Sequence, residues 1–157
     1  MKFTVSETPL GPIVESAARA AGLESDSRMR VTLDSGLVVR GDAVRLRQVV
    51  LNLLSNAARY TPAEGIITVN AVHRDSETVL EVHNTGSHLT PDEIAHVFDR
   101  FYRADPSRQR ASGGTGLGLT IVKNLIEAQG GRVWAQSDNS GVTFAFAVPS
   151  QTRPQST

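Results

Sequence analysis

The stretch from residue 45 to residue 60 constrains the fold most, because it specifies one long helix with two different faces. Apolar side chains recur along it at helical spacing, and a polar stripe runs beside them. The polar stripe contains two asparagines, which are poor helix formers because the amide competes for backbone hydrogen bonds. The apolar stripe comprises Leu46, Val50, Leu53, Ala57 and Tyr60, and the polar stripe comprises Arg45, Gln48, Asn52, Asn56 and Arg59.

Two explanations of the paired asparagines remain open at this level. Asn52 and Asn56 either lie on a solvated helix edge, or they direct two amide oxygens at a cation or a polar ligand. The helix by itself does not separate these explanations.

The rest of the sequence alternates helical and strand patterns. Asp42 is expected to cap the asparagine-bearing helix, and Thr61-Pro62 to end it. Short turns join most strands, so we expect a mixed, mostly antiparallel sheet covered on one face by helices, an α+β two-layer sandwich. Further helices are predicted over 9–21, 91–101 and 117–129, and strands over 28–33, 37–40, 65–73, 77–84, 132–137 and 142–148.

Length and composition indicate one globular domain. The 157 residues suffice for a single core, which we place in residues 1–149, followed by a polar tail over 150–157. Lys+Arg and Asp+Glu are 16 each, a balance that argues against nonspecific nucleic-acid binding. Cysteine is absent, and no apolar run is long enough to insert into a membrane.

A glycine-rich stretch, GGTGLGL over residues 113–119, is the second informative feature. Glycines let backbone N–H groups approach a ligand, and the helix that follows presents a positive dipole end. The stretch is therefore either an anion site, with phosphate as the expected anion, or a flexible hinge. It lacks the Gly-Lys-Ser/Thr of a Walker loop, and its glycines do not fit the dinucleotide-binding pattern. The polar, basic residues 102–115 before it predict a mobile loop.

Three stretches resemble one family closely. RLRQVVLNLLSNAARYTP looks like the N box of bacterial sensor histidine kinases, VFDRFYRAD like their F box, and GGTGLGLTIVKNLIEAQGG like their second glycine box. They occur in the family's order, and the resemblance runs from about residue 9 to residue 149. It implies the ATP-binding catalytic domain, whose fold is shared with gyrase, chaperone and mismatch-repair ATPases, with a mobile ATP lid.

The resemblance also implies a set of site residues. Asn56 matches the asparagine that holds Mg²⁺ through its amide oxygen, and Asn52 lies one turn before it. Arg59 and Tyr60 match positions near the phosphates and the nucleoside, and Thr143 matches a hydroxyl behind the adenine. The expected lid residues are Tyr102, Arg103, Gly114, Thr115, Gly116, Leu117, Gly118 and Leu119.

The first glycine box departs from the family pattern of Asp-x-Gly-x-Gly. It reads Asn84-Thr85-Gly86-Ser87-His88 here. Asn84 keeps an acceptor oxygen for the adenine amino group but loses the charge, and its NH₂ needs a partner. His88 either adds bulk to the base pocket or turns outward.

The implied function is the kinase half of an autophosphorylating enzyme. Such a domain binds Mg²⁺-ATP and passes the γ-phosphoryl group to a histidine on a dimerisation domain, with a response regulator downstream. We expect a cytoplasmic domain, monomeric in isolation, from a parent protein anchored in a membrane. The alternatives are a self-contained ATPase, which has a glutamate at the position of Asn52, and a degenerate nucleotide-binding or interaction domain.

Overall fold

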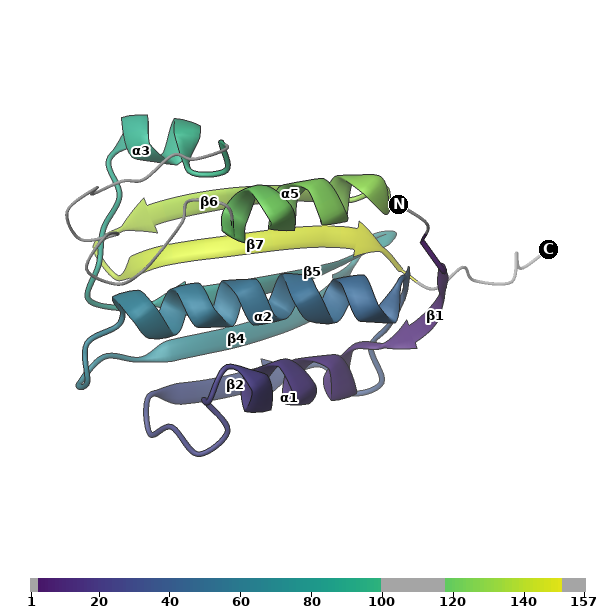
Figure 1. Ribbon diagram of the computed structural model, residues 1–157, viewed down its shortest axis with the longest axis horizontal. Helices are drawn as coiled ribbons and strands as arrows, with labels where there is room; N and C mark the ends of the chain where they lie inside the picture. Colours follow the sequence, from purple (N-terminus) through teal and green to yellow (C-terminus); the bar gives the residue numbers. More distant parts are fainter. Residues whose placement is uncertain (1–2, 100–117, 151–157) are drawn as a thin grey trace.

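The computed structural model describes residues 3–99 and 118–150. Over these residues the chain is an α+β two-layer sandwich, as expected (Figure 1). Helices α1 (Leu10–Ala20), α2 (Ala43–Tyr60) and α5 (Gly118–Ala128) cover one face of a five-stranded sheet. None of the helices in the described part of the chain is both long and apolar enough to cross a membrane.

The sheet is mixed, with the strand order β2-β4-β5-β7-β6. The first pair, β2 and β4, is parallel, and the other pairs are antiparallel. The predicted hairpin over residues 65–84 is confirmed, with Ile67 opposite Asn84 and Arg74 opposite Glu77. The strands are β2 (Met29–Leu33), β4 (Ile67–Arg74), β5 (Glu77–Asn84), β6 (Arg132–Asp138) and β7 (Gly141–Pro149).

A small second sheet lies beside the main one. The strand expected after the turn at residues 34–36 is β3 (Val38–Gly41), but it does not join the main sheet. It pairs antiparallel with β1 (Ser6–Pro9), a segment without a clear pattern in the sequence. Strand β2 therefore does not pair with β3. It pairs in parallel with β4, and the Ala71 carbonyl of β4 accepts from the Asp34 N–H at 3.2 Å.

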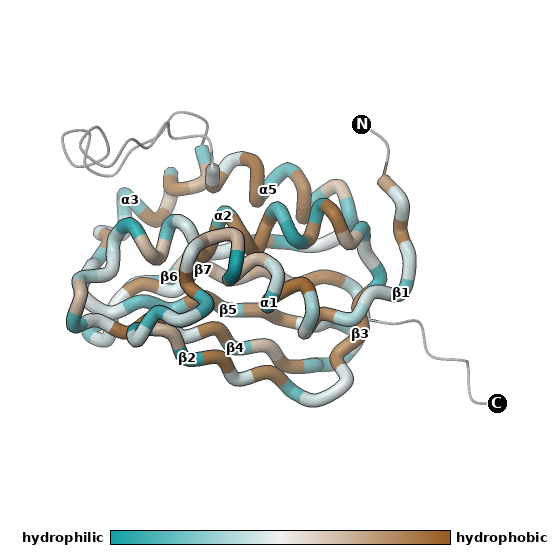
Figure 2. The backbone as a smooth tube through the Cα atoms, turned by 60° about the horizontal axis from the view of Figure 1, so that its bottom comes forward, coloured by the Kyte–Doolittle hydropathy of each residue, from teal (hydrophilic) through white to brown (hydrophobic). Residues whose placement is uncertain are grey.

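The core lies between the helices and the sheet. In Figure 2 hydrophobic stretches recur along α2, α5 and the strands beneath them. On β7 the side chains of Phe144, Phe146 and Val148 alternate toward the helices. Fully buried side chains in this layer include Leu10, Leu46, Leu53, Leu54, Ile67, Leu80, Ile126 and Phe146.

Two predicted boundaries differ from the structure. Helix α3 (Pro91–His96) starts with a capping box between Thr90 and Glu93 but is shorter than the expected 91–101. A turn follows it, in which the Asp99 N–H donates to the His96 carbonyl at 2.8 Å. Residues 100 and 101 lie outside the described part.

The expected polar tail begins one residue too early. Ser150 is 9% exposed and contacts Thr78 Oγ1 at 3.1 Å and His73 Nδ1 at 2.8 Å. It also bridges to Val39 of β3. Ser150 therefore belongs to the fold, and residues 151–157 lie outside the described part.

Candidate functional site

The asparagine-bearing helix α2 is fixed at its start by Asp42. The Asp42 side chain accepts from the Arg45 N–H at 3.1 Å, which confirms the predicted N-cap. The next turns bury Leu46, Val50 and Leu53 against the sheet and α5. This packing leaves the polar stripe beside the start of α5.

Part of the stripe makes polar contacts within the fold. The Asn52 amide nitrogen donates to the Gly118 carbonyl at 3.2 Å, and its oxygen accepts from Gln48 Nε2 at 2.7 Å. Both halves of the Asn52 amide are thus engaged, whereas Asn56 makes no side-chain hydrogen bond to the described residues. Asn56 is half-buried, and its amide oxygen is available to a ligand.

A divalent cation at this position would depend on that amide. In residues 3–99 and 118–150, no three His, Cys, Asp or Glu side chains gather as a metal site. Mg²⁺ needs few protein ligands when it also binds phosphate oxygens and retains waters. The oxygen chemistry of Asn56 fits such an ion.

The end of α2 is held by Arg28, which belongs to none of the motifs in the sequence. The Arg28 guanidinium donates to the carbonyls of Thr61 at 2.6 Å and Ala58 at 3.3 Å. Carbonyls in the last turn of a helix have no intrahelical partner, so Arg28 satisfies two of them. Between these two residues, Arg59 is exposed and Tyr60 is half-buried.

Asp26 orients this guanidinium. Its carboxylate accepts from Arg28 Nε at 3.0 Å and from Arg28 Nη2 at 2.8 Å. The side-chain hydrogen bond from Arg28 holds the pKa of Asp26 at about 2, below its usual 3.8. Asp26 and Arg28 are only two positions apart in the sequence, and this spacing was the available signal.

Asn84 is buried at the end of β5, on the helix-covered face. It is 3% exposed and follows Leu80 and Val82 in the alternation that points toward the core. Its amide nitrogen donates to Ser87 Oγ at 2.8 Å and to the Thr85 carbonyl at 3.4 Å. The NH₂ group therefore has its partners within the box, which leaves the carbonyl oxygen to accept from a ligand.

Gly86 brings this box onto the end of α2. Its φ is +87°, and a Cβ atom there would lie 2.5 Å from Pro62 Cδ. Only glycine permits this approach of the two segments. The contact joins the loop after Asn84 to the residues that follow Tyr60.

His88 is exposed, and its Nδ1 lies 3.0 Å from the Asp138 carbonyl oxygen. This contact attaches the imidazole to the turn between β6 and β7. Of the two expectations for His88, the structure shows the outward one.

Thr143 does not lie with the other expected site residues. Its hydroxyl lies 2.8 Å from His83 Nδ1, its cross-strand neighbour on β5. Both residues fall in the alternation that points away from Leu80, Val82 and Phe144. Thr143 thus lies on the open face of the sheet, opposite the helices.

The second glycine box is described only at its end. Gly118 begins α5 and accepts from Asn52, and Leu119 packs against the core. The other expected lid residues, Tyr102, Arg103, Gly114, Thr115, Gly116 and Leu117, lie outside the described residues, as does the loop predicted to be mobile.

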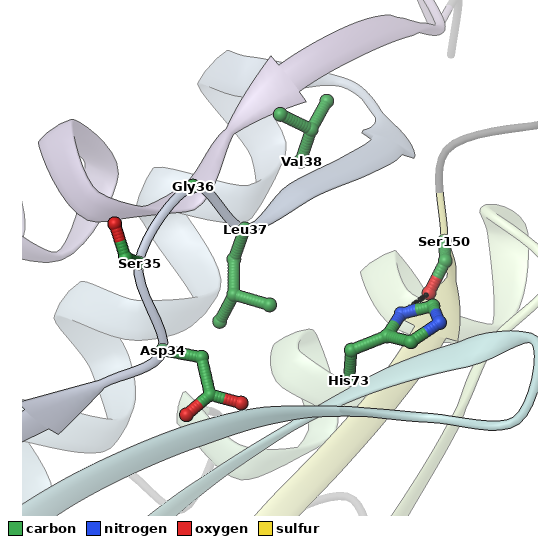
Figure 3. Close-up of a pocket in the computed structure, with 7 residues that line it drawn as sticks. All are labelled: Asp34, Ser35, Gly36, Leu37, Val38, His73 and Ser150. Atoms are coloured by element: carbon green, nitrogen blue, oxygen red, sulfur yellow. Dashed lines mark hydrogen bonds between the residues drawn. The ribbon is translucent and has the colours of Figure 1, made fainter.

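A separate hollow of about 310 Å³ lies at the other end of the sheet (Figure 3). The imidazole of His73 and the hydroxyl of Ser150 meet on one side, and Asp34 lies across from them. On β4, His73 is about 20 Å along the strand from Ile67, the partner of Asn84. The hollow is therefore no part of the candidate site.

Comparison with known proteins gives a family match. Residues 41–152 match the family of histidine kinase-, DNA gyrase B- and HSP90-like ATPases. The chain is 45% identical over 112 residues to the probable sensor kinase SilS of Salmonella typhimurium, covering 71% of this chain and 22% of that protein. It is 36% identical over 149 residues to the signal transduction histidine-protein kinase BaeS of Escherichia coli (strain K12), covering 94% of this chain and 32% of that protein.

The solved structures agree with the fold. The mycobacterial sensor histidine kinase MprB superimposes with a TM-score of 0.81 at 26% identity, covering 94% of this chain and 100% of that chain. The present chain spans between about a fifth and a third of the length of the two curated relatives.

Proposed function

The chain belongs to the family of histidine kinase-, DNA gyrase B- and HSP90-like ATPases, and we propose that it is the ATP-binding catalytic domain of a sensor histidine kinase. In this role it binds Mg²⁺-ATP and donates the γ-phosphoryl group to a histidine on a dimerisation domain of the same kinase. The observation that carries the proposal is the position of Asn56. Its available amide lies on α2 one turn beyond Asn52, which is bonded to the start of α5.

Different residues of the site contact different parts of Mg²⁺-ATP in this proposal. Asn84, with its NH₂ already bonded, presents its carbonyl oxygen to the amino group of adenine. Asn56 would hold the magnesium ion, which supplies charge neutralisation on the triphosphate. The resemblance assigns the phosphate contacts to Arg59, Tyr60 and the lid residues.

Asn52 supports transfer to a protein acceptor over hydrolysis. An amide cannot take a proton from water, and both of its polar atoms are engaged with Gln48 and Gly118. Catalysis by this domain therefore rests on positioning and on charge neutralisation, as phosphoryl transfer generally does.

The remaining parts of the proposal concern the parent protein. The phosphorylated histidine would pass its phosphoryl group to a response regulator. We place the domain in the cytoplasm, where ATP is available, with the parent protein anchored in a membrane. In isolation we expect a monomer.

Replacement of Asn56 tests the proposal. The Asn56→Ala protein should lose Mg²⁺-dependent ATP binding and transfer of the γ-phosphoryl group to an added dimerisation domain, because no other amide occupies that position. Circular dichroism should show it folded, since Asn56 is half-buried outside the apolar core. Titration calorimetry and radiolabel transfer are the measurements, and His83→Gln on the open face is the control. Undiminished transfer by the alanine variant would refute the assignment.

A further inference from the structure

Polar contacts connect helices α2 and α5 at two positions along their length. At one position Asn52 donates to the Gly118 carbonyl at 3.2 Å. At the other, the Asp42 N–H donates to Gln129 Oε1 at 2.7 Å. Gln129 directly follows α5, so the helices run in opposite directions, as Figure 1 shows.

The contact between Asp42 and Gln129 is buried, and both polar atoms of the Gln129 side chain are hydrogen-bonded. Gln129 is 9% exposed, and its Nε2 donates to the Leu125 carbonyl at 3.0 Å. One amide thus connects the last turn of α5 to the residue that caps α2. Gly41 makes room for it, because a Cβ atom there would lie 2.8 Å from Gln129 Oε1 and 2.7 Å from Leu46 Cδ1.

The spacing of the two ties sets the register of the helices. At 1.5 Å per residue, Asp42 and Asn52 are about 15 Å apart along α2. Gly118 and Gln129 are about 16 Å apart along α5. Because these spans match, sliding α5 along α2 would stretch both ties together, and α5 begins at the second glycine box.

A third segment joins at the same residue. The Thr4 N–H donates to Asp42 Oδ2 at 2.7 Å, while Oδ1 caps α2. The carboxylate is 6% exposed. Burial acts to raise the pKa of Asp42, but the N–H groups of Thr4, Arg45 and Val44 outweigh it and lower that pKa. The ionised side chain therefore holds the segment before β1 and the start of α2 at once.

We propose that Asp42 and Gln129 are positioning residues that hold α5 in register with α2 and couple the segment at Thr4 to the nucleotide site. This inference rests on the proposed function, because Asn56 and the start of α5 are taken as the two sides of that site. A displacement at Thr4 reaches Asp42 directly, Gln129 through the Asp42 N–H, and Gly118 through the rigid helix α5.

Two substitutions test the contact of Asp42 with Gln129 and the contact of Asp42 with Thr4 separately. Gln129→Met keeps the length of the side chain and removes both hydrogen bonds. Asp42→Ser keeps an N-cap for α2 but cannot reach the Thr4 N–H. Ser16→Ala is the matched control, since it removes a polar tie between α2 and α1, the bond from Arg47 Nε at 2.8 Å.

The first readout is the nuclear magnetic resonance spectrum of the nucleotide-free 157-residue protein. The Asn52 side-chain amide signals should move in Gln129→Met and stay in place in Ser16→Ala. In Asp42→Ser, the Gln129 side-chain signals should move and the Thr4 amide should exchange faster. Unchanged Asn52 signals in Gln129→Met, in a folded protein, would overturn the proposal whether or not the protein binds nucleotide.

The second readout is Mg²⁺-ADP affinity by calorimetry at 15 °C, with circular dichroism as the check that each variant is folded. Gln129→Met should weaken binding about three- to tenfold, in the range that coupling substitutions reach. Ser16→Ala should leave affinity within about twofold. Equal affinity of Gln129→Met and wild type would show a purely structural bond and overturn the proposal. Failure of the wild-type protein to bind nucleotide would instead refute the proposed function. The spectra would still show whether Asp42 and Gln129 hold α5 in register with α2. If Gln129→Met does not fold, Asp42→Ser replaces it as the test. Unchanged Gln129 side-chain signals in Asp42→Ser would then overturn the proposal.

Discussion

At the residue scale, Asn84 shows how a neutral side chain can stand where the family has an aspartate. Its amide nitrogen donates hydrogen bonds to Ser87 and Thr85, so the NH₂ group has its partners before any ligand binds. The sequence showed the departure from the family pattern. It did not show the partner, because the bond to Ser87 depends on how the loop folds at Gly86.

Replacing Asn84 by aspartate should tighten nucleotide binding. A charged acceptor makes a stronger hydrogen bond to the adenine amino group, by on the order of 1 kcal/mol, which corresponds to about fivefold in affinity. The Ser87 hydroxyl can rotate to donate to the new carboxylate. Titration calorimetry with Mg²⁺-ADP measures the change, and adenine should remain preferred over guanine.

His88→Gly is the companion variant in that experiment. Because the imidazole is exposed and bonded to the Asp138 carbonyl, its removal should change affinity less than about twofold. A gain from His88→Gly together with none from Asn84→Asp would show that His88, and not the uncharged acceptor, limits recognition of the base.

At the element scale, helix and strand boundaries with local causes were predictable. Asp42 caps α2, and Thr61-Pro62 ends it, because both signals act within one turn of the helix. The β4–β5 hairpin was likewise predictable from two alternating runs and a short turn. These features are determined by neighbours in the sequence.

Contacts between distant segments were not predictable in the same way. The pairing of β3 with β1 depends on a segment that carries no strand pattern of its own. The expected role of Thr143 came from the resemblance alone, whereas the alternation of Phe144, Phe146 and Val148 in β7 already puts Thr143 on the opposite face. The strand pattern predicted over residues 28–33 does not indicate that Arg28 reaches the end of α2.

The contact of Arg28 with the end of α2 predicts a pH-dependent stability. The folded-state pKa of Asp26 is about 2, below the usual 3.8, so its ionised form stabilises the fold fully above about pH 5. This contribution is lost as the pH falls through about 2. The urea midpoint gap between wild type and Asp26→Asn should therefore be largest near pH 7 and about half as large at pH 3.

A double-mutant cycle identifies the source of that gap. Arg28→Gln in both backgrounds gives the coupling between the two side chains, which should shrink with pH in the same way. A gap that does not change between pH 7 and pH 3 would mean that Asp26 does not stabilise the end of α2 through its charge.

At the scale of the whole molecule, the chain has the fold of the family, and the proposed function gives it the nucleotide-binding part of a phosphoryl transfer. It spans between about a fifth and a third of the length of the curated relatives. Residues 41–152 match the ATPase family, yet Asn52 provides no base for attack by water. Under the proposed function, the protein should turn over ATP only when a histidine is presented to it.

This dependence predicts bimolecular kinetics for the chain with a separate dimerisation domain. Transfer should rise in proportion to acceptor concentration, because each event requires an encounter. A short flexible tether supplies an effective concentration of the order of millimolar, so 1 µM of free acceptor should react about 10³-fold more slowly than a fused one. Quenched-flow measurement of labelled phosphohistidine tests both statements, with an acceptor whose histidine is replaced by glutamine as the control. Phosphate release without acceptor at the rate of transfer would show instead that the protein is a self-contained ATPase.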